Sequence, residues 1–134
     1  QMLNGCIGGL VAITAEPLMP SPLAAILIGA VGGVIVVYGT KFLLSLKIDD
    51  VVGAIPAHLF AGIWGTLAVP ITNPDTSFGT QLLGVVSINV FVFAVSFVIW
   101  FLMKNTFGIR LSKEGELKGT DVTETGVIAY AIRD

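Results

Sequence analysis

The sequence predicts an all-α membrane protein in which a bundle of transmembrane helices is followed by a polar tail. Hydrophobic residues make up 54% of the chain and charged residues 12%, whereas a globular chain carries roughly 25% charged residues. Three apolar runs are longer than the roughly 20 residues that a helix needs to cross a bilayer. All the basic residues also fall on one side of these runs, as expected for segments that alternate in direction across a membrane.

Four helices are expected in chain order, at residues 2–15, 23–46, 51–72 and 81–103. Residues 1–103 would form the transmembrane region and residues 104–134 a C-terminal tail. The last apolar run is rich in β-branched and aromatic residues, but its unbroken length favours a helix because strands rarely exceed about 10 residues. The first run is shorter and starts directly at the first residue, so we expect the chain to be a fragment of a longer protein.

The connectors between these helices predict which side of the membrane each one faces. The first and third connectors contain the acidic residues Glu16 and Asp75 and no lysine or arginine. The basic residues flank the second connector or follow the last helix: Lys41, Lys47, Lys104, Arg110, Lys113, Lys118 and Arg133. Because basic residues collect on the cytoplasmic side, we expect a multi-pass protein of the plasma or inner membrane with its C-terminus in the cytoplasm.

Charge and cysteine content exclude several other classes of protein. The formal net charge is −2 and the basic residues do not cluster, so nothing indicates a nucleic-acid partner. Cys6 is the only cysteine, which rules out an internal disulfide and leaves no thiol pair at metal-ligand spacing. We therefore expect no metal and no cofactor, and we expect Cys6 to be a small buried side chain.

Small residues predict where the helices pack closely. Ala25, Gly29 and Gly33 recur every four residues, which places them on one face of a helix. Gly5 and Gly9 in the first helix and the step from Gly84 to Ser87 in the last one repeat the pattern less regularly. In membranes such rows let a neighbouring helix approach closely, so we expect these faces to be helix contacts.

The only histidine, His58, is the main candidate for a functional side chain. It lies about eight residues into the third segment, about 12 Å from its start at helical rise, and therefore inside the hydrocarbon region. On an α-helix small residues share its face, whereas Ile63 and Trp64 would point elsewhere. The small residues of that face are Ala54, Ala61, Gly62 and Gly65.

Two interpretations of this face are open. A second helix could pack against it and satisfy the imidazole with a hydrogen bond, which would make His58 a structural residue. Alternatively, the missing side-chain volume is a narrow lumen, and the ring faces whatever passes through it. Ionisable groups inside membranes are rare and usually mark pathways, which favours the second interpretation.

The start of the helix that carries His58 is expected to depend on Asp49, Asp50 and Pro56, which all precede the histidine. Pro56 lacks a backbone N–H and should loosen the turn that precedes the histidine. Irregular backbone at this depth is tolerated where it is packed in protein or lines a cavity. Asp49 and Asp50 stand where carboxylates cap free N–H groups and complement the positive end of a helix.

The stretch "DDVVGAIPAHLFAGIWGTLAV" resembles the tenth transmembrane helix of the ammonium transporter (Amt/Mep/Rh) superfamily. It has that helix's aspartate pair, its histidine eight residues after the second aspartate, and its Gly-Ile-Trp-Gly-Thr-Leu sequence. The residues from Asn4 to Ala15 resemble the eighth helix, and "GIRLSKEGELKGTD" resembles the cytoplasmic tail. The resemblance covers essentially the whole chain and implies a helical bundle fragment of four out of about eleven helices.

The resemblance implies a transporter, not an enzyme, that moves ammonium or ammonia through a hydrophobic pore for nitrogen uptake. His58 would be the second of two hydrogen-bonded pore histidines, with Ala54 one turn away on the pore wall. Gly62 and Gly65 would be structural positions of the same helix. Removing the proton is economical, because ammonium loses far more hydration energy than ammonia in an apolar lumen. A neutral imidazole can exchange that proton, since it offers one donor and one acceptor nitrogen.

The tail carries most of the charge and is expected to be weakly ordered by itself. The resemblance implies that it packs against the cytoplasmic face and contacts a neighbouring subunit of a homotrimer in the lipid bilayer. It also implies a PII-type signal protein as a possible partner. The docking positions that it implies are Gly108, Asp121, Gly126 and Tyr130.

Two other functions stay open from the sequence. His58 could be an axial haem ligand of an electron-transfer subunit, with the second ligand supplied by a partner because the chain has no other histidine. The chain could also be a non-conducting assembly or sensory remnant of a transporter.

Overall fold

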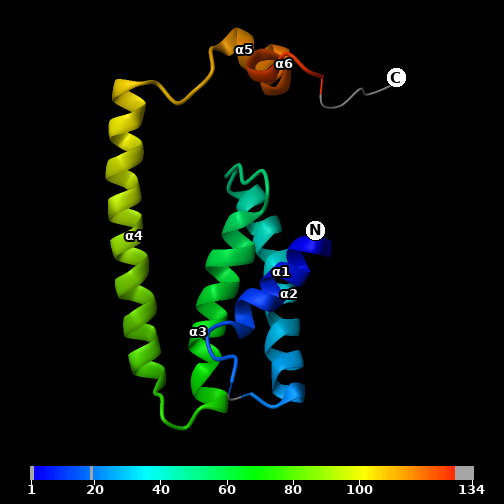
Figure 1. The fold of residues 1–134 in the computed structure, drawn as a ribbon, viewed down its shortest axis with the longest axis vertical. Helices are drawn as coiled ribbons and strands as arrows, with labels where there is room; N and C mark the ends of the chain where they lie inside the picture. The colour runs from blue at the N-terminus through cyan, green and yellow to red at the C-terminus, as the bar shows by residue number, and fades with distance from the viewer. Residues whose placement is uncertain (1, 19, 129–134) are drawn as a thin grey trace. The chain divides into compact units, whose positions relative to one another are not determined.

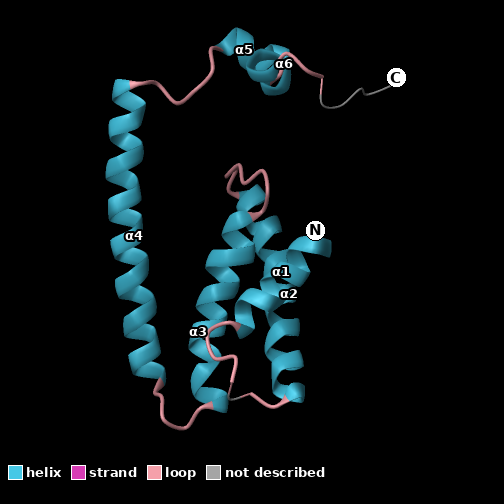
Figure 2. Cartoon of the chain, viewed as in Figure 1, coloured by secondary structure: helices cyan, strands magenta, loops and turns pink. Residues whose placement is uncertain are grey.

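The computed structural model describes residues 2–18 and 20–128, and within these ranges every regular element is a helix (Figure 2). Three helical stretches of the described residues are long and apolar enough to cross a membrane: Pro22–Ser45, Ile55–Thr72 and Phe78–Thr106. The predicted class, an all-α membrane protein, is therefore confirmed. The chain divides into two compact units, Gln1–Val90 and Phe91–Asp134, which are described separately.

The helical elements follow one another along the chain as labelled in Figure 1. They are α1 (Met2–Ile13), α2 (Pro22–Ser45), η1 (Ile55–Phe60), α3 (Ala61–Thr72), α4 (Phe78–Thr106), α5 (Lys113–Lys118) and α6 (Thr120–Thr125). The predicted start of the third helix at residue 51 is too early, because residues 51 and 52 form a turn and Gly53 has a φ of +72°. α4 is longer at both ends than the predicted range.

Glycines bring α1 and α2 into close backbone contact. A Cβ atom added to Gly9 would lie 3.0 Å from the carbonyl oxygen of Gly29, and one added to Gly33 would lie 3.3 Å from that of Gly5. The predicted close contact at these glycines is thus confirmed. The sequence reading missed Gly32, where an added Cβ would lie 2.7 Å from the carbonyl oxygen of Gly8. Such proximity favours dispersion and weak Cα–H contacts between the two helices.

The rod formed by η1 and α3 packs beside α1 and α2 (Figure 1). Most of its buried side chains are small. The core between the helices consists of two clusters: Ala12, Ile28 and Ala68 in one, and Val36, Ala57 and Ala61 in the other. The indole Nε1 of Trp64 donates a hydrogen bond of 3.1 Å to the carbonyl oxygen of Ile28, which ties α3 to α2. The close packing of small residues is typical of helices that associate within a membrane.

Hydrogen bonds hold connectors in place at both ends of the first unit. Asn73 Nδ2 donates to a carboxylate oxygen of Glu16 over 2.9 Å, which links the first and third connectors. At the opposite end, Asn4 Nδ2 donates to the carbonyl oxygen of Val52 over 2.7 Å. The charge pattern predicted that the first and third connectors share one side of the membrane, and this arrangement agrees with that expectation.

Much of the apolar surface is exposed. None of the residues of α4 is buried, although it is the most hydrophobic of the three candidate spans. In its C-terminal part, the rings of Phe93, Phe97 and Phe101 stack in succession with centroids 6.3 and 6.2 Å apart. Cys6 is also exposed, so the prediction that it is buried is wrong.

Candidate functional site around His58

His58 lies in a wide helical turn. η1 is a π-helix, and the N–H of Ala61 after it donates to the carbonyl oxygens of both Pro56 and His58. Pro56 has no N–H to donate, so the preceding turn cannot complete regular α-helical bonding at this residue. Single wide turns within α-helices are rare and are often found at functional sites. The loosened turn that the sequence predicted before His58 therefore takes the form of a π-helix that includes it.

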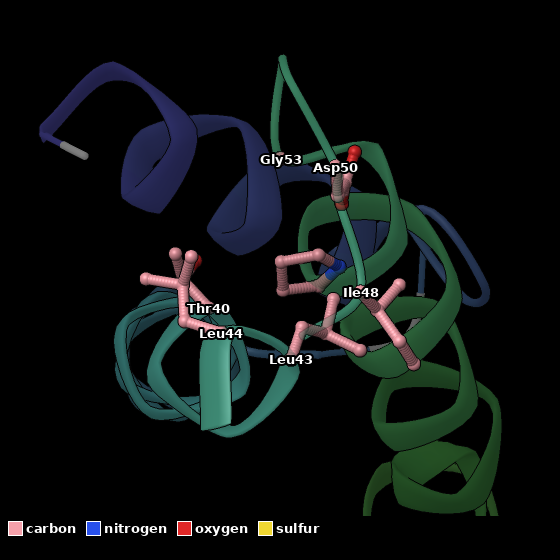
Figure 3. A pocket seen from close by; sticks show the side chains of 7 residues that line it. Thr40, Leu43, Leu44, Ile48, Asp50 and Gly53 are labelled. Carbon is pink, nitrogen blue, oxygen red and sulfur yellow. The ribbon is translucent and has the colours of Figure 1, made fainter. Parts of the chain in front are cut away.

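Asp50 holds the start of this turn. Its Oδ1 accepts a hydrogen bond of 2.9 Å from the N–H of Ala54, and its Oδ2 accepts one of 2.8 Å from the N–H of Ile55. A carboxylate at this position satisfies two otherwise free donors and complements the positive helix end. Asp49 is exposed. A cavity of about 30 Å³ lies between this turn and the C-terminal part of α2 (Figure 3).

One side of η1 packs closely against α2. Pro56 and Ala57 are buried, and Ala57 packs with Val36 of α2. A Cβ atom added to Gly39 of α2 would lie 2.7 Å from Cδ2 of Phe60 and 3.0 Å from Cβ of Pro56. Because these contacts leave no space for larger side chains, they determine how η1 is rotated about its axis. His58 is exposed and lies outside these packing contacts.

The imidazole of His58 lines a cavity of about 310 Å³ within the first unit. Its wall is largely apolar and includes side chains of η1, α3 and the first part of α4. The polar side chains in the wall are those of His58, Thr66, Gln81 and Asn89. Thr66 donates its hydroxyl to the carbonyl oxygen of Gly62, and Asn89 donates its amide to that of Val85. Both side chains keep an oxygen that can accept a further hydrogen bond.

The structure divides the small-residue face that the sequence predicted around His58. Gly62 lines the cavity with it, but Ala61 is fully buried in the packing against α1 and α2. Gly65 is buried as well, and an added Cβ would collide with the backbone of Ala12. Ile63, which was expected to point elsewhere, lines the cavity. The prediction was wrong here because it assumed α-helical rotation, whereas a π-helix has more residues per turn.

The other predicted pathway residue, Ala54, lies one turn before His58 and is exposed. The residues that line the cavity of about 310 Å³ do not include it. The sequence reading also missed Thr66, Gln81 and Asn89. Gln81 and Asn89 could have been found, because they are polar side chains in or beside the apolar run of the last membrane segment.

The sequence model of the Ammonium Transporter Family matches residues 1–130. The chain belongs to this family. It is 34% identical to the ammonium transporter Amt2 of Archaeoglobus fulgidus over 95% of the chain and 31% of the relative. It is 37% identical to Amt1 of Haloferax mediterranei, over 96% of the chain and 26% of the relative. It is 33% identical to the ammonium transporter of Bacillus subtilis, over 96% of the chain and 36% of the relative.

The chain therefore spans about a third of the length of these relatives. Their names are those of transporters, so the family is one of transporters and not of enzymes. The match also identifies the chain as part of a multi-pass membrane protein, in agreement with its apolar helices.

The tail of this ammonium transporter family member has more structure than the sequence predicted. Ser112 caps the N-terminus of α5, and its hydroxyl oxygen accepts a hydrogen bond of 3.1 Å from the N–H of Gly115. Arg110 forms a two-point ion pair with Glu116, with distances of 2.5 and 3.0 Å. α6 packs on α5, and Thr123 donates its hydroxyl to the carbonyl oxygen of Gly115 over 3.1 Å. The expectation of a weakly ordered tail is thus wrong for these two helices.

Three of the four expected docking positions lie at or beside helix ends. Gly108 has a φ of +71°, and its N–H donates to the carbonyl oxygen of Met103 at the end of α4. Gly126 has a φ of +70° and ends α6 in the left-handed conformation that glycine adopts without strain. Asp121 lies in the first turn of α6. Tyr130 lies outside the described residues.

The ion pair in the tail predicts a pH dependence. The hydrogen bonds from Arg110 hold the pKa of Glu116 below its ordinary value, and the guanidinium charge acts in the same direction. The ion pair therefore contributes its full stabilisation of α5 at pH values above the ordinary glutamate pKa of about 4.3. This stabilisation is lost as the pH falls through the lowered pKa of Glu116. An NMR titration of the Glu116 carboxyl carbon in the Arg110→Met variant should give a higher midpoint than in the unsubstituted protein.

Lys118→Met provides the matched control, because it removes one positive charge from the same helix but lies two residues from Glu116, a spacing at which helical side chains do not face each other. Its midpoint should stay at that of the unsubstituted protein. Equal midpoints in the Arg110→Met variant and the unsubstituted protein would contradict the assigned role of the ion pair.

Proposed function

We propose that the chain is the C-terminal portion of a transporter that moves ammonium or ammonia across a membrane through a largely apolar pore. One observation carries this proposal. The chain belongs to the ammonium transporter family, and its only histidine, His58, lies on the wall of a cavity and not in the packed core. A histidine that served only packing would be expected among the contacts with α1 and α2, where Ala57 and Ala61 are found.

His58 acts in this proposal as a proton-exchanging group. One ring nitrogen accepts a proton from ammonium while the other gives its proton to the next acceptor, so the ring returns to the neutral form. Ammonia then crosses the apolar section without the hydration cost of a cation. By family resemblance, a second histidine forms a hydrogen-bonded pair with His58. It belongs to a part of the transporter that precedes this chain. By the same resemblance, Ala54 lies on the pore wall outside the cavity of about 310 Å³, whereas Gly62 lines that cavity and leaves space beside the imidazole.

The whole protein would be a homotrimer of the plasma or inner membrane that serves nitrogen uptake, with its C-terminus in the cytoplasm. The family resemblance supports the trimer. The distribution of basic residues supports the orientation, because five of the seven follow the last apolar run.

The test is transport by the whole protein after reconstitution into liposomes. An inward ammonium gradient should produce uptake that a potassium gradient of the same size does not. Correctly inserted protein without ammonium uptake would overturn the proposal and would favour a non-conducting assembly or sensory role. The Soret band in the absorption spectrum of the purified protein tests the haem alternative, because a haem ligated by His58 would produce this band.

The tail has a regulatory role in this proposal, and PII-type signal proteins are its proposed partners. Truncation after Lys104 removes α5 and α6 but leaves the apolar helices complete apart from the end of α4. The truncated transporter should insert normally, while its uptake rate or its dependence on ammonium concentration changes at least about fivefold, the lower range of allosteric coupling. An unchanged rate and unchanged concentration dependence would exclude a regulatory tail.

A further inference from the structure

A side chain of α1 contacts the turn from which the helix of His58 starts. Asn4 Nδ2 donates a hydrogen bond of 2.7 Å to the carbonyl oxygen of Val52, although the two residues are 48 positions apart in the sequence. This turn is closed by the N–H of Gly53, which donates to the carbonyl oxygen of Asp50 over 3.1 Å. The hydrogen bond from Asn4 therefore joins α1 directly to the segment that precedes η1.

Apolar burial contributes little to the position of this turn. The side chains of Val51 and Val52 are 88% and 72% exposed. Asn4 instead lies against Gly53, where an added Cβ would collide with its amide nitrogen. Gly53 also has a φ of +72°, a conformation that other residues adopt only with strain. The hydrogen bond and the close fit of the amide thus hold the turn against α1.

The turn is rigidly connected to His58. Asp50 accepts hydrogen bonds from the N–H groups of Ala54 and Ile55, and the N–H of Ala57 donates to the carbonyl oxygen of Gly53 over 3.2 Å. Each residue from the turn to His58 therefore either takes part in a backbone hydrogen bond or is next to a residue that does. A shift of the turn would be transmitted to the imidazole, because no flexible linker separates them.

From these contacts we infer that Asn4 is a positioning residue for His58: its amide holds the turn that sets the place of the imidazole at the cavity wall. The inference rests on the proposed function, in which His58 exchanges protons. Asn4 itself is not among the residues that line the cavity of about 310 Å³. Its contribution is the free energy of one hydrogen bond between α1 and the turn, which corresponds to about a fivefold change in the population of the positioned state.

The test compares Asn4→Leu with Asn105→Leu in the whole transporter. Asn105 is the matched control, because its amide also donates over 2.7 Å to a backbone carbonyl, that of Phe101, but within α4 alone. Asn4→Leu should lower the maximal uptake rate about fivefold and shift its pH profile, at an unchanged amount of inserted protein. Asn105→Leu should change neither. Asn4→Gln keeps the donor, and the exposed turn can adjust to the longer side chain, so it should restore most of the rate.

An NMR measurement separates this inference from the proposed function. The imidazole resonances of His58 are assigned by their loss in His58→Gln, and their chemical shifts report the surroundings of the ring whether or not the protein transports ammonium. Asn4→Leu should move these resonances, and Asn105→Leu should not. Unchanged resonances together with an unchanged pH profile in Asn4→Leu would overturn the inference. Moved resonances combined with normal uptake in His58→Leu would support the positioning and would overturn instead the proton-exchanging role proposed for His58.

Discussion

Alanine in place of Gly65 is expected to destabilise the packing of the first unit by about 3 kcal/mol, the upper range for overpacked cores, although it adds only one methyl group. A Cβ at this position would collide with the carbonyl oxygen, carbonyl carbon and Cα of Ala12. These are backbone atoms of α1, so no side chain can rotate away to make room. The apparent melting temperature of the purified transporter should therefore fall clearly below that of the unsubstituted protein.

Gly84→Ala is the matched control for this substitution. Gly84 is also a helical glycine, but an added Cβ would meet no other group within 4 Å, so the close helix contact predicted there from sequence is wrong. The same chemical change should leave the melting temperature unchanged or raise it slightly, because alanine favours the helix more than glycine does. Equal melting temperatures for Gly65→Ala and Gly84→Ala would mean that α1 and α3 do not approach each other as closely as described.

Replacing His58 with leucine should reduce ammonium uptake by about a hundredfold or more, which is the typical contribution of a positioned proton-transfer group. Leucine fills a similar space but can neither accept nor donate a proton. Ammonium uptake by the reconstituted protein provides the measurement.

His58→Gln separates proton exchange from simple hydrogen bonding. Glutamine retains a donor and an acceptor but does not exchange protons near neutral pH. If His58 relays protons, glutamine should lose transport as leucine does. Full transport with glutamine would restrict the role of His58 to hydrogen bonding, and full transport with leucine would remove it from the pathway.

The membrane helices could be predicted from sequence because their length and hydropathy are local properties. The approach of Gly29 and Gly33 to α1 could also be predicted, since a row of small residues has few uses other than a close helix contact. The expected burial of Cys6 was wrong for a physical reason. In a membrane protein an exposed apolar side chain can face lipid, so low polarity does not imply burial.

The surroundings of His58 could be predicted only in part. Its place in an apolar segment favours a lumen over a packed helix contact but leaves both interpretations open, and the side chains beside it depend on the helix geometry. The π-helix at Ile55–Phe60 arises from packing of Pro56 and Phe60 on Gly39 as well as from the proline itself. Such contacts join residues far apart in the sequence, and no local pattern indicates them.

The two tail helices show the same limit. Each has only six residues, which is too short for a helix that is stable by its own propensity. Their support comes from the ion pair of Arg110 with Glu116 and from the hydrogen bond of Thr123 to Gly115. Neither contact follows from the spacing of apolar residues, so a reading based on periodicity predicts disorder.

The π-helix also affects how this segment tolerates changes in length. Deleting one residue from an ordinary helix turns everything beyond the deletion by about 100°, which would move Gly65 and Ala68 away from α1 and α2. Within Ile55–Phe60, a one-residue deletion would instead convert the wide turn to α-helical geometry. The Asp50 cap before it and the packed face after it would then keep their relative orientation, so homologous chains can differ by one residue here and retain the same bundle.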